Sequence, residues 1–255
     1  MKRRQFVASS LLAVPALSES QPIRAAPQKA FYELRTYQFR FGASQASLDN
    51  YLKNALIPAL NRMGVKNVGV FREWGKSDPP KLTVLIPHAS AEAFVTMAGQ
   101  LAGDSAYTQA SQEYTNLTPD KVPFSRYTSS LLSAFDGLPQ LAVPAKEGRI
   151  FELRTYEGYA EDAVRRKIKM FNVDELPIFY KVKLNPVFFG EVVAGEHMPC
   201  LTYMLVFKDM AERDANWKAF SADPDWKRIS PLPEYANTVS NIIRVFLEPV
   251  AYSQI

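Results

Sequence analysis

The sequence predicts an α+β fold in which two ferredoxin-like β-α-β-β-α-β repeats pair into an α/β barrel. One observation is an internal repeat, because Glu-Leu-Arg-Thr-Tyr occurs at residues 33–37 and again at residues 152–156, an offset of 119 residues. The same offset carries Pro58 onto Pro177 and Asp104 onto Asp223. The other observation is that strand-like and helix-like patterns alternate in the same order in each half.

The first half contains two helix-like segments between four strand-like ones. Apolar residues recur at spacings of three and four from Leu48 to Met63, which predicts an amphipathic helix. Pro58 lies inside this pattern and removes a backbone donor, so we expect a kink or break there. A second helix is expected over 91–101. Strands are expected over 31–39, 67–74, 82–87 and 124–132.

The second half repeats this order. Strands are expected near 150–157, 186–193, 201–208 and 239–248, and helices near 161–180 and 209–221. Both helices of such a repeat cover one face of its sheet, which leaves the other face bare. Two copies in one chain can bury these bare faces against each other, so we expect the repeats to pair intramolecularly.

The chain divides into four segments. Residues 1–26 are expected to be an export signal, residues 27–133 the first repeat and residues 149–255 the second. The linker over 134–148 contains Gly137, Pro139, Pro144 and Gly148. The content of hydrophobic residues, 47%, suffices for packed cores, and the single cysteine excludes an intrachain disulfide.

The N-terminus predicts the destination of the protein. Arg3 and Arg4, followed by Phe6, resemble a bacterial twin-arginine signal, and the apolar stretch after them is too short to span a bilayer. We expect a periplasmic or secreted protein with no membrane span in the mature chain. Residues 1–26 also hold four basic residues and one acidic residue, so the net charge of +4 falls to +1 without them. This balance excludes a nucleic-acid binder.

Several of these segments resemble the NIPSNAP family. They are Tyr-Glu-Leu-Arg-Thr-Tyr at 32–37, its echo at 151–156, the proline-bearing first helix and Asp-Pro-Asp-Trp at 223–226. The resemblance covers roughly 30–132 and 149–248, and it implies the dimeric α/β barrel superfamily. Relatives on that fold include haem enzymes, cofactor-free oxygenases and simple binding proteins, so the resemblance implies architecture and leaves the reaction open.

Strand alternation selects the candidate site residues. Leu34 and Leu153 are expected under the helices, which would turn their neighbours on each strand into the barrel interior. Each repeat would then place an acid, a guanidinium and a phenol in the interior. These groups could bind a carboxylate or polarise a carbonyl. Alternatively, the acids and arginines could pair with each other and serve only structure. The candidate ligand-binding residues are Glu33, Arg35, Tyr37, Glu152, Arg154 and Tyr156.

No metal or cofactor is expected. His88 ends a predicted strand, and His197 lies beside Met198 and Cys200 in a predicted hairpin loop, without a second group of ligands at suitable spacing. The sequence also contains no phosphate-binding glycine loop and no hydrolase or zinc-protease motif.

Three functions stay open at this point. The first is binding of a small organic ligand in the barrel lumen. The second is a cofactor-independent oxygenase or isomerase, and the third is a ligand-free protein-interaction module. A lumen of several hundred Å³ favours the first two. The sequence determines neither a catalytic residue nor an oligomeric state.

Overall fold

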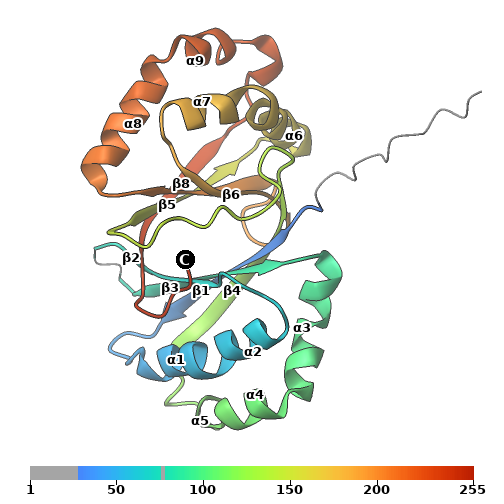
Figure 1. Cartoon of the computed structure of the whole chain (residues 1–255), viewed down its shortest axis with the longest axis vertical. Coiled ribbons are helices and arrows are strands. Elements are labelled where there is room, and N and C mark those ends of the chain that lie inside the picture. The colour runs from blue at the N-terminus through green and yellow to red at the C-terminus, as the bar shows by residue number, and fades with distance from the viewer. Residues whose placement is uncertain (1–27, 76–77) are drawn as a thin grey trace, which may run out of the picture.

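The computed structural model describes residues 28–75 and 78–255, and its strands form one closed barrel (Figure 1). The strands follow the order β1-β3-β2-β8-β5-β7-β6-β4, and all neighbours are antiparallel. Each repeat supplies four adjacent strands. The seams between the repeats are the β2–β8 and β4–β6 pairs. The predicted export signal lies outside the described residues.

The described part of the first repeat contains four strands and six helical segments. They are β1 (Phe31–Phe39), α1 (Ala46–Tyr51), η1 (Leu52–Leu56), α2 (Ile57–Arg62), β2 (Gly69–Glu73), β3 (Lys81–His88), α3 (Ala91–Gly103), α4 (Ser105–Ala110), α5 (Gln112–Thr115) and β4 (Phe124–Ala134).

The second repeat has the same order. Its elements are β5 (Ile150–Glu157), α6 (Glu161–Met170), η2 (Phe171–Glu175), α7 (Leu176–Lys181), β6 (Pro186–Ala194), β7 (Cys200–Phe207), α8 (Met210–Ala222), α9 (Pro224–Ile229), η3 (Pro233–Tyr235) and β8 (Asn241–Pro249). The predicted strands and long helices are all present, with ends shifted by at most two residues. The short helices α4, α5 and α9 were not predicted.

The first helix of each repeat carries the irregularity that its proline predicts. Pro58 and Pro177 lie at the second position of α2 and α7, directly after the π-helical turns η1 and η2. A proline cannot donate the usual backbone hydrogen bond and crowds the carbonyl four residues earlier. The wider turn accommodates this, so the helix continues in place of breaking.

The core has three parts. One lies between the first sheet and its helices, and the second lies between the other sheet and its helices. Figure 1 shows these helical layers on opposite sides of the strands. The third part is inside the barrel, where aromatic residues such as Tyr32, Phe71, Phe151 and Phe188 fill one end. Ile255 is buried against this inner cluster.

Candidate functional site

The structure corrects the predicted direction of the site residues. Leu34 and Leu153, expected under the helices, line the barrel cavity. Their neighbours on β1 and β5 therefore point outward, toward the helices. Tyr37 packs in the core beneath α1 and α2, and Tyr156 packs in the corresponding core of the second repeat. The six residues Glu33, Arg35, Tyr37, Glu152, Arg154 and Tyr156 are thus outside the lumen.

The alternation was predicted correctly, but the faces were exchanged. Both faces of a closed barrel strand are buried, so an apolar residue does not by itself indicate the helix-covered side. Here the interior takes the leucines because its filled end is apolar, with Tyr32 and Phe151 on the same faces as Leu34 and Leu153. The acids and arginines instead lie under the helices, which supply further hydrogen-bond donors to Glu152.

Glu152 is the centre of a buried ion cluster in the second repeat. Its carboxylate accepts hydrogen bonds from Arg154 Nη1 at 2.7 Å, from Arg213 Nε and Nη2 at 2.9 Å each, and from Trp217 Nε1 at 2.9 Å. Burial alone would raise the pKa of Glu152, but the hydrogen bonds from Arg213 and its other partners outweigh it and lower that pKa. Every oxygen of the acid is satisfied within the fold, which favours a structural role.

Glu33 has a smaller set of partners in the first repeat. It forms a two-point pair with Arg35, with Nη2 to Oε2 at 3.0 Å, and accepts a hydrogen bond from Ser129 Oγ at 2.8 Å. His88 Nε2 lies 3.6 Å from Oε2. Burial raises the pKa of Glu33, but His88 and Arg35 outweigh it and lower the pKa to about 2. The structure therefore pairs each acid with the arginine of its own strand.

The two tyrosines also bond or pack within their repeats. Tyr156 accepts a 2.8 Å hydrogen bond from Tyr203 Oη, and burial raises the pKa of Tyr203 well above its ordinary value. Tyr37 packs against Tyr127 with ring centres 5.0 Å apart, and burial raises its pKa. Both are core side chains that face the helices.

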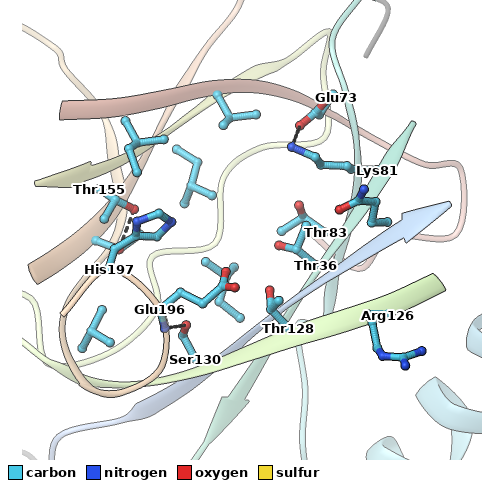
Figure 2. A pocket seen from close by; sticks show the side chains of 17 residues that line it. Thr36, Glu73, Lys81, Thr83, Arg126, Thr128, Ser130, Thr155, Glu196 and His197 are labelled. Atoms are coloured by element: carbon cyan, nitrogen blue, oxygen red, sulfur yellow. Dashed lines mark hydrogen bonds and ion pairs between the residues drawn. The ribbon is translucent and has the colours of Figure 1, made fainter. Parts of the chain in front are cut away.

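The barrel interior holds the candidate site, a cavity of about 270 Å³ (Figure 2). This size is near the lower end of the range of ligand pockets, about 300–1,000 Å³. Residues from all eight strands and from the β6–β7 loop form its wall. The lining residues are Leu34, Thr36, Gln38, Glu73, Lys81, Thr83, Arg126, Thr128, Ser130, Leu153, Thr155, Val192, Glu196, His197, Thr202, Ile243 and Val245.

Threonine hydroxyls form a layer across the middle of this cavity. Thr36 is the cross-strand neighbour of both Thr83 and Thr128, and Figure 2 shows the three side by side. On the second sheet, Thr155 is the cross-strand neighbour of Thr202, and their hydroxyl oxygens are 2.9 Å apart. The next residues toward the filled end are Leu34, Leu153 and Val245, with Ser130 as a polar exception. A ligand would therefore meet hydroxyls on one side and a largely hydrophobic floor on the other.

Charged side chains surround the mouth of the cavity. Lys81 Nζ lies 3.7 Å from a carboxylate oxygen of Glu73, and Arg126 on β4 lines the wall apart from this pair (Figure 2). The β6–β7 loop contributes Glu196 and His197 to the same wall. Both signs of charge are present, so the mouth does not favour a strongly anionic or cationic ligand.

The polar lining was missed because a threonine on a strand is an ordinary β residue. The available signal was the repeat itself, since Thr36 and Thr83 map onto Thr155 and Thr202 at the same offset. The buried Lys167–Glu175 pair was also missed. Its atoms Nζ and Oε2 are 2.7 Å apart, and burial raises the pKa of Glu175.

Residues 28–75 and 78–255 contain neither a candidate metal cluster nor a helix that could span a membrane. No group of three His, Cys, Asp or Glu side chains there is placed to hold a metal ion. Cys200 is buried, which raises its thiol pKa to about 11. None of the helices in the described ranges has the length and apolar character needed to cross a bilayer.

Whole-chain structural comparisons show the same barrel in other proteins. A candidate monooxygenase from Fusobacterium nucleatum superposes with a TM-score of 0.57 at 8% identity, covering 88% of this chain and 93% of its own. Another from Lactobacillus acidophilus gives 0.56 at 10% identity, covering 87% and 94%. These similarities establish the dimeric α/β barrel fold. No curated protein matches the sequence.

Comparison at the level of one repeat finds similarity to the NIPSNAP family. A NIPSNAP-like domain protein from Burkholderia xenovorans is 17% identical over 42% of this chain and 90% of its own, with a TM-score of 0.39. The NIPSNAP family model itself matches residues 151–254. Over these residues, the second repeat is similar to the NIPSNAP family.

Proposed function

We propose that the protein binds a small organic molecule inside the barrel. The observation that carries this proposal is the lumen cavity of about 270 Å³, whose wall combines threonine hydroxyls with aliphatic side chains. A barrel that served only as a scaffold would be filled by side chains along its whole length. Here only one end is filled.

The lining favours an uncharged ligand with one or two oxygen atoms and an apolar body. Thr36, Thr83 and Thr155 can donate to or accept from carbonyl and hydroxyl groups. Leu34 and Leu153 on the floor offer apolar contact. The fold alone gives no substrate, because proteins with this barrel differ in function.

Two neighbouring isoleucines offer a matched test. Ile243 lines the cavity, whereas Ile242 on the same strand points to the other face and is 45% exposed. Ile243→Trp should fill the lumen, and Ile242→Trp should leave it open. Native mass spectrometry of protein purified from its source should detect a bound compound in the wild type and Ile242→Trp, and lose it in Ile243→Trp.

Two results would contradict this proposal. One is equal retention of the compound in both tryptophan variants. The other is a wild type without any retained compound whose melting temperature also does not respond to a panel of small neutral ketones and alcohols.

The first repeat is proposed to be a diverged copy of the same domain. Support comes from the shared element order, the π-helical turn before Pro58 and Pro177, and the matching positions of Thr36 and Thr155. Such a duplication explains why Thr36 and Thr83 recur as Thr155 and Thr202 in the wall of the cavity.

The protein is further proposed to be exported by the twin-arginine route, on the evidence of Arg3, Arg4 and Phe6. Replacing both arginines with lysine should leave unprocessed precursor in the cytoplasm, measured by fractionation and the mass of the N-terminal peptide. Normal maturation of that variant outside the cytoplasm would refute the assignment.

A further inference from the structure

His197 stands at the mouth of the cavity in an arrangement suited to acid–base chemistry. Its Nδ1 lies 2.8 Å from Glu157 Oε1. An ionised carboxylate only accepts hydrogen bonds, so the neutral tautomer that suits this contact carries its proton on Nδ1. In the neutral ring, Nε2 then has a free lone pair. His197 belongs to the cavity wall.

Glu157 is itself held in place. Its second oxygen, Oε2, accepts a 2.9 Å hydrogen bond from Asn241 Nδ2, and its backbone carbonyl accepts from Ser240 N at 2.7 Å and Ser240 Oγ at 3.0 Å. The carboxylate is about one quarter exposed, whereas His197 is about half exposed. The acid therefore orients an imidazole whose far nitrogen remains accessible from the cavity.

The backbone around His197 is also constrained. His197 has a φ of +65°, a left-handed conformation that is uncommon for residues other than glycine. The loop is tied to β4 through Glu196 N and Ser130 Oγ, 3.4 Å apart. Residues held in such conformations are concentrated at functional sites, because the strain persists only where the surroundings impose it.

The β2–β3 hairpin, on the opposite side of the same mouth, carries different side chains. There, the cavity wall carries the Lys81–Glu73 ion pair. The titratable groups around His197 are Glu157 on β5, Glu196 on its own loop and Arg126 across the mouth on β4. His197 and Thr155 both belong to the cavity wall (Figure 2).

We propose that His197 is a general base for isomerisation of a β,γ-unsaturated ketone held against Thr155 and Thr202, with Glu157 as its positioning residue. This inference rests on the proposed binding of a small ligand in the lumen. It names carbonyl compounds with an acidic α C–H as the substrate class. A base, an orienting acid and hydroxyl donors to the carbonyl oxygen are the groups that this chemistry requires.

The step balances without an oxidant or a cofactor. His197 Nε2 takes one α proton, and the C–H electron pair forms a new C=C bond while the carbonyl electrons move onto oxygen. The resulting dienolate oxygen accepts a hydrogen bond from the hydroxyl of Thr155 or Thr202, and Glu157 stabilises the imidazolium. Nε2–H then returns the proton to the γ carbon, which restores the carbonyl and leaves a conjugated enone.

The test uses the full-length protein and β,γ-unsaturated cyclic ketones of increasing ring size as probes. Binding is measured by calorimetry, and isomerisation is followed by the ultraviolet absorbance of the conjugated product. We expect His197→Gly to keep probe affinity and lose about a hundredfold or more in rate, the usual contribution of a general base. Glycine suits the left-handed backbone, so this variant should remain folded. Added imidazole should restore part of the rate, because the mouth is open.

Glu157→Gln should lower kcat and leave KM nearly unchanged, which a merely structural role would not do. Ile243→Trp should lose both binding and rate. A wild type that binds the probes but isomerises them no faster than His197→Gly would overturn the inference and leave ligand binding intact. Failure of every probe to bind would count against both proposals. Unchanged turnover in His197→Gly would overturn the role of His197, because another residue would then be the base.

Discussion

Two buried acids on equivalent strands obtain their partners differently. Glu33 pairs with Arg35 on its own strand and with Ser129 on the neighbouring strand. Glu152 also receives two hydrogen bonds from Arg213 on α8. A carboxylate buried beneath helices needs such donors, because leaving it unpaired costs several kcal/mol. Both carboxyls are therefore ionised at neutral pH, and their ion pairs stabilise the folded protein.

The lowered pKa of Glu33 predicts a loss of stability in acid. The folded-state pKa is about 2 and the ordinary value is 4.5, so the stabilisation is fully present above pH 4.5 and is lost as pH falls toward 2. Glu33→Gln mimics the protonated acid. The difference in unfolding free energy between wild type and this variant should shrink by about 2 kcal/mol between about pH 6 and pH 3.

Urea unfolding at a series of pH values measures this difference. Glu147→Gln, in the exposed linker, serves as the control. Its difference in unfolding free energy from the wild type should not shrink in the same way as pH falls. A difference for Glu33→Gln that stays constant over the whole range would mean that its carboxylate titrates normally in the folded protein.

At the scale of elements, the π-helical turns set the rotation of the helix that follows them. Each turn holds one more residue than an α-helical turn would, and it comes directly before the proline. In the second repeat, this rotation places Ile178 and Phe179 in the core. Val173 lies within the turn and is 60% exposed, so its side chain contributes little to packing.

Deletion of Val173 should therefore destabilise the protein far more than Val173→Ala. Removing one residue rotates α7 by roughly 100° relative to its sheet and moves Ile178 and Phe179 away from the core. We expect a loss of at least about 3 kcal/mol for the deletion, and less than about 0.5 kcal/mol for the alanine variant. Chemical denaturation measures both, and equal stabilities would show that the wide turn has no role in orienting α7.

At the scale of the whole molecule, neither repeat can complete its own sheet. The edges of the first repeat, β2 and β4, pair with β8 and β6 of the second. The interior side chains of both repeats form a single cluster in which Tyr32 packs 5.0 Å from Phe188, ring centre to ring centre. Separating the repeats would expose two strand edges and an apolar sheet face together.

A fragment of residues 27–140 should consequently self-associate. Its free edges β2 and β4 can pair with those of a second copy, in the way that they pair with β8 and β6 here. Sedimentation should detect a dimer or larger aggregates at micromolar concentration, whereas the full chain keeps both edges covered internally. A soluble, folded monomer of the fragment would contradict this account.

The sequence by itself determined the two-repeat α+β architecture, the element order and the proline-linked irregularity of the first helices. These depend on local periodicity and on the repeat offset, which are properties of the chain alone. It also indicated that Glu33 and Arg35 share one side of their strand. Export by residues 1–26 stays a prediction, because that segment lies outside the described residues.

Only the tertiary structure decided which side of each strand faces the lumen. Both faces of the barrel are buried, so the hydrophobic pattern could not show whether Leu34 faces the interior or lies under a helix. In the structure it lines the cavity. Closure of the barrel also gathered Thr36, Thr83, Thr155 and Thr202 around one cavity, although 166 residues separate the first from the last. Their proximity arises from the β2–β8 and β4–β6 seams, long-range pairings that no local pattern in the chain encodes.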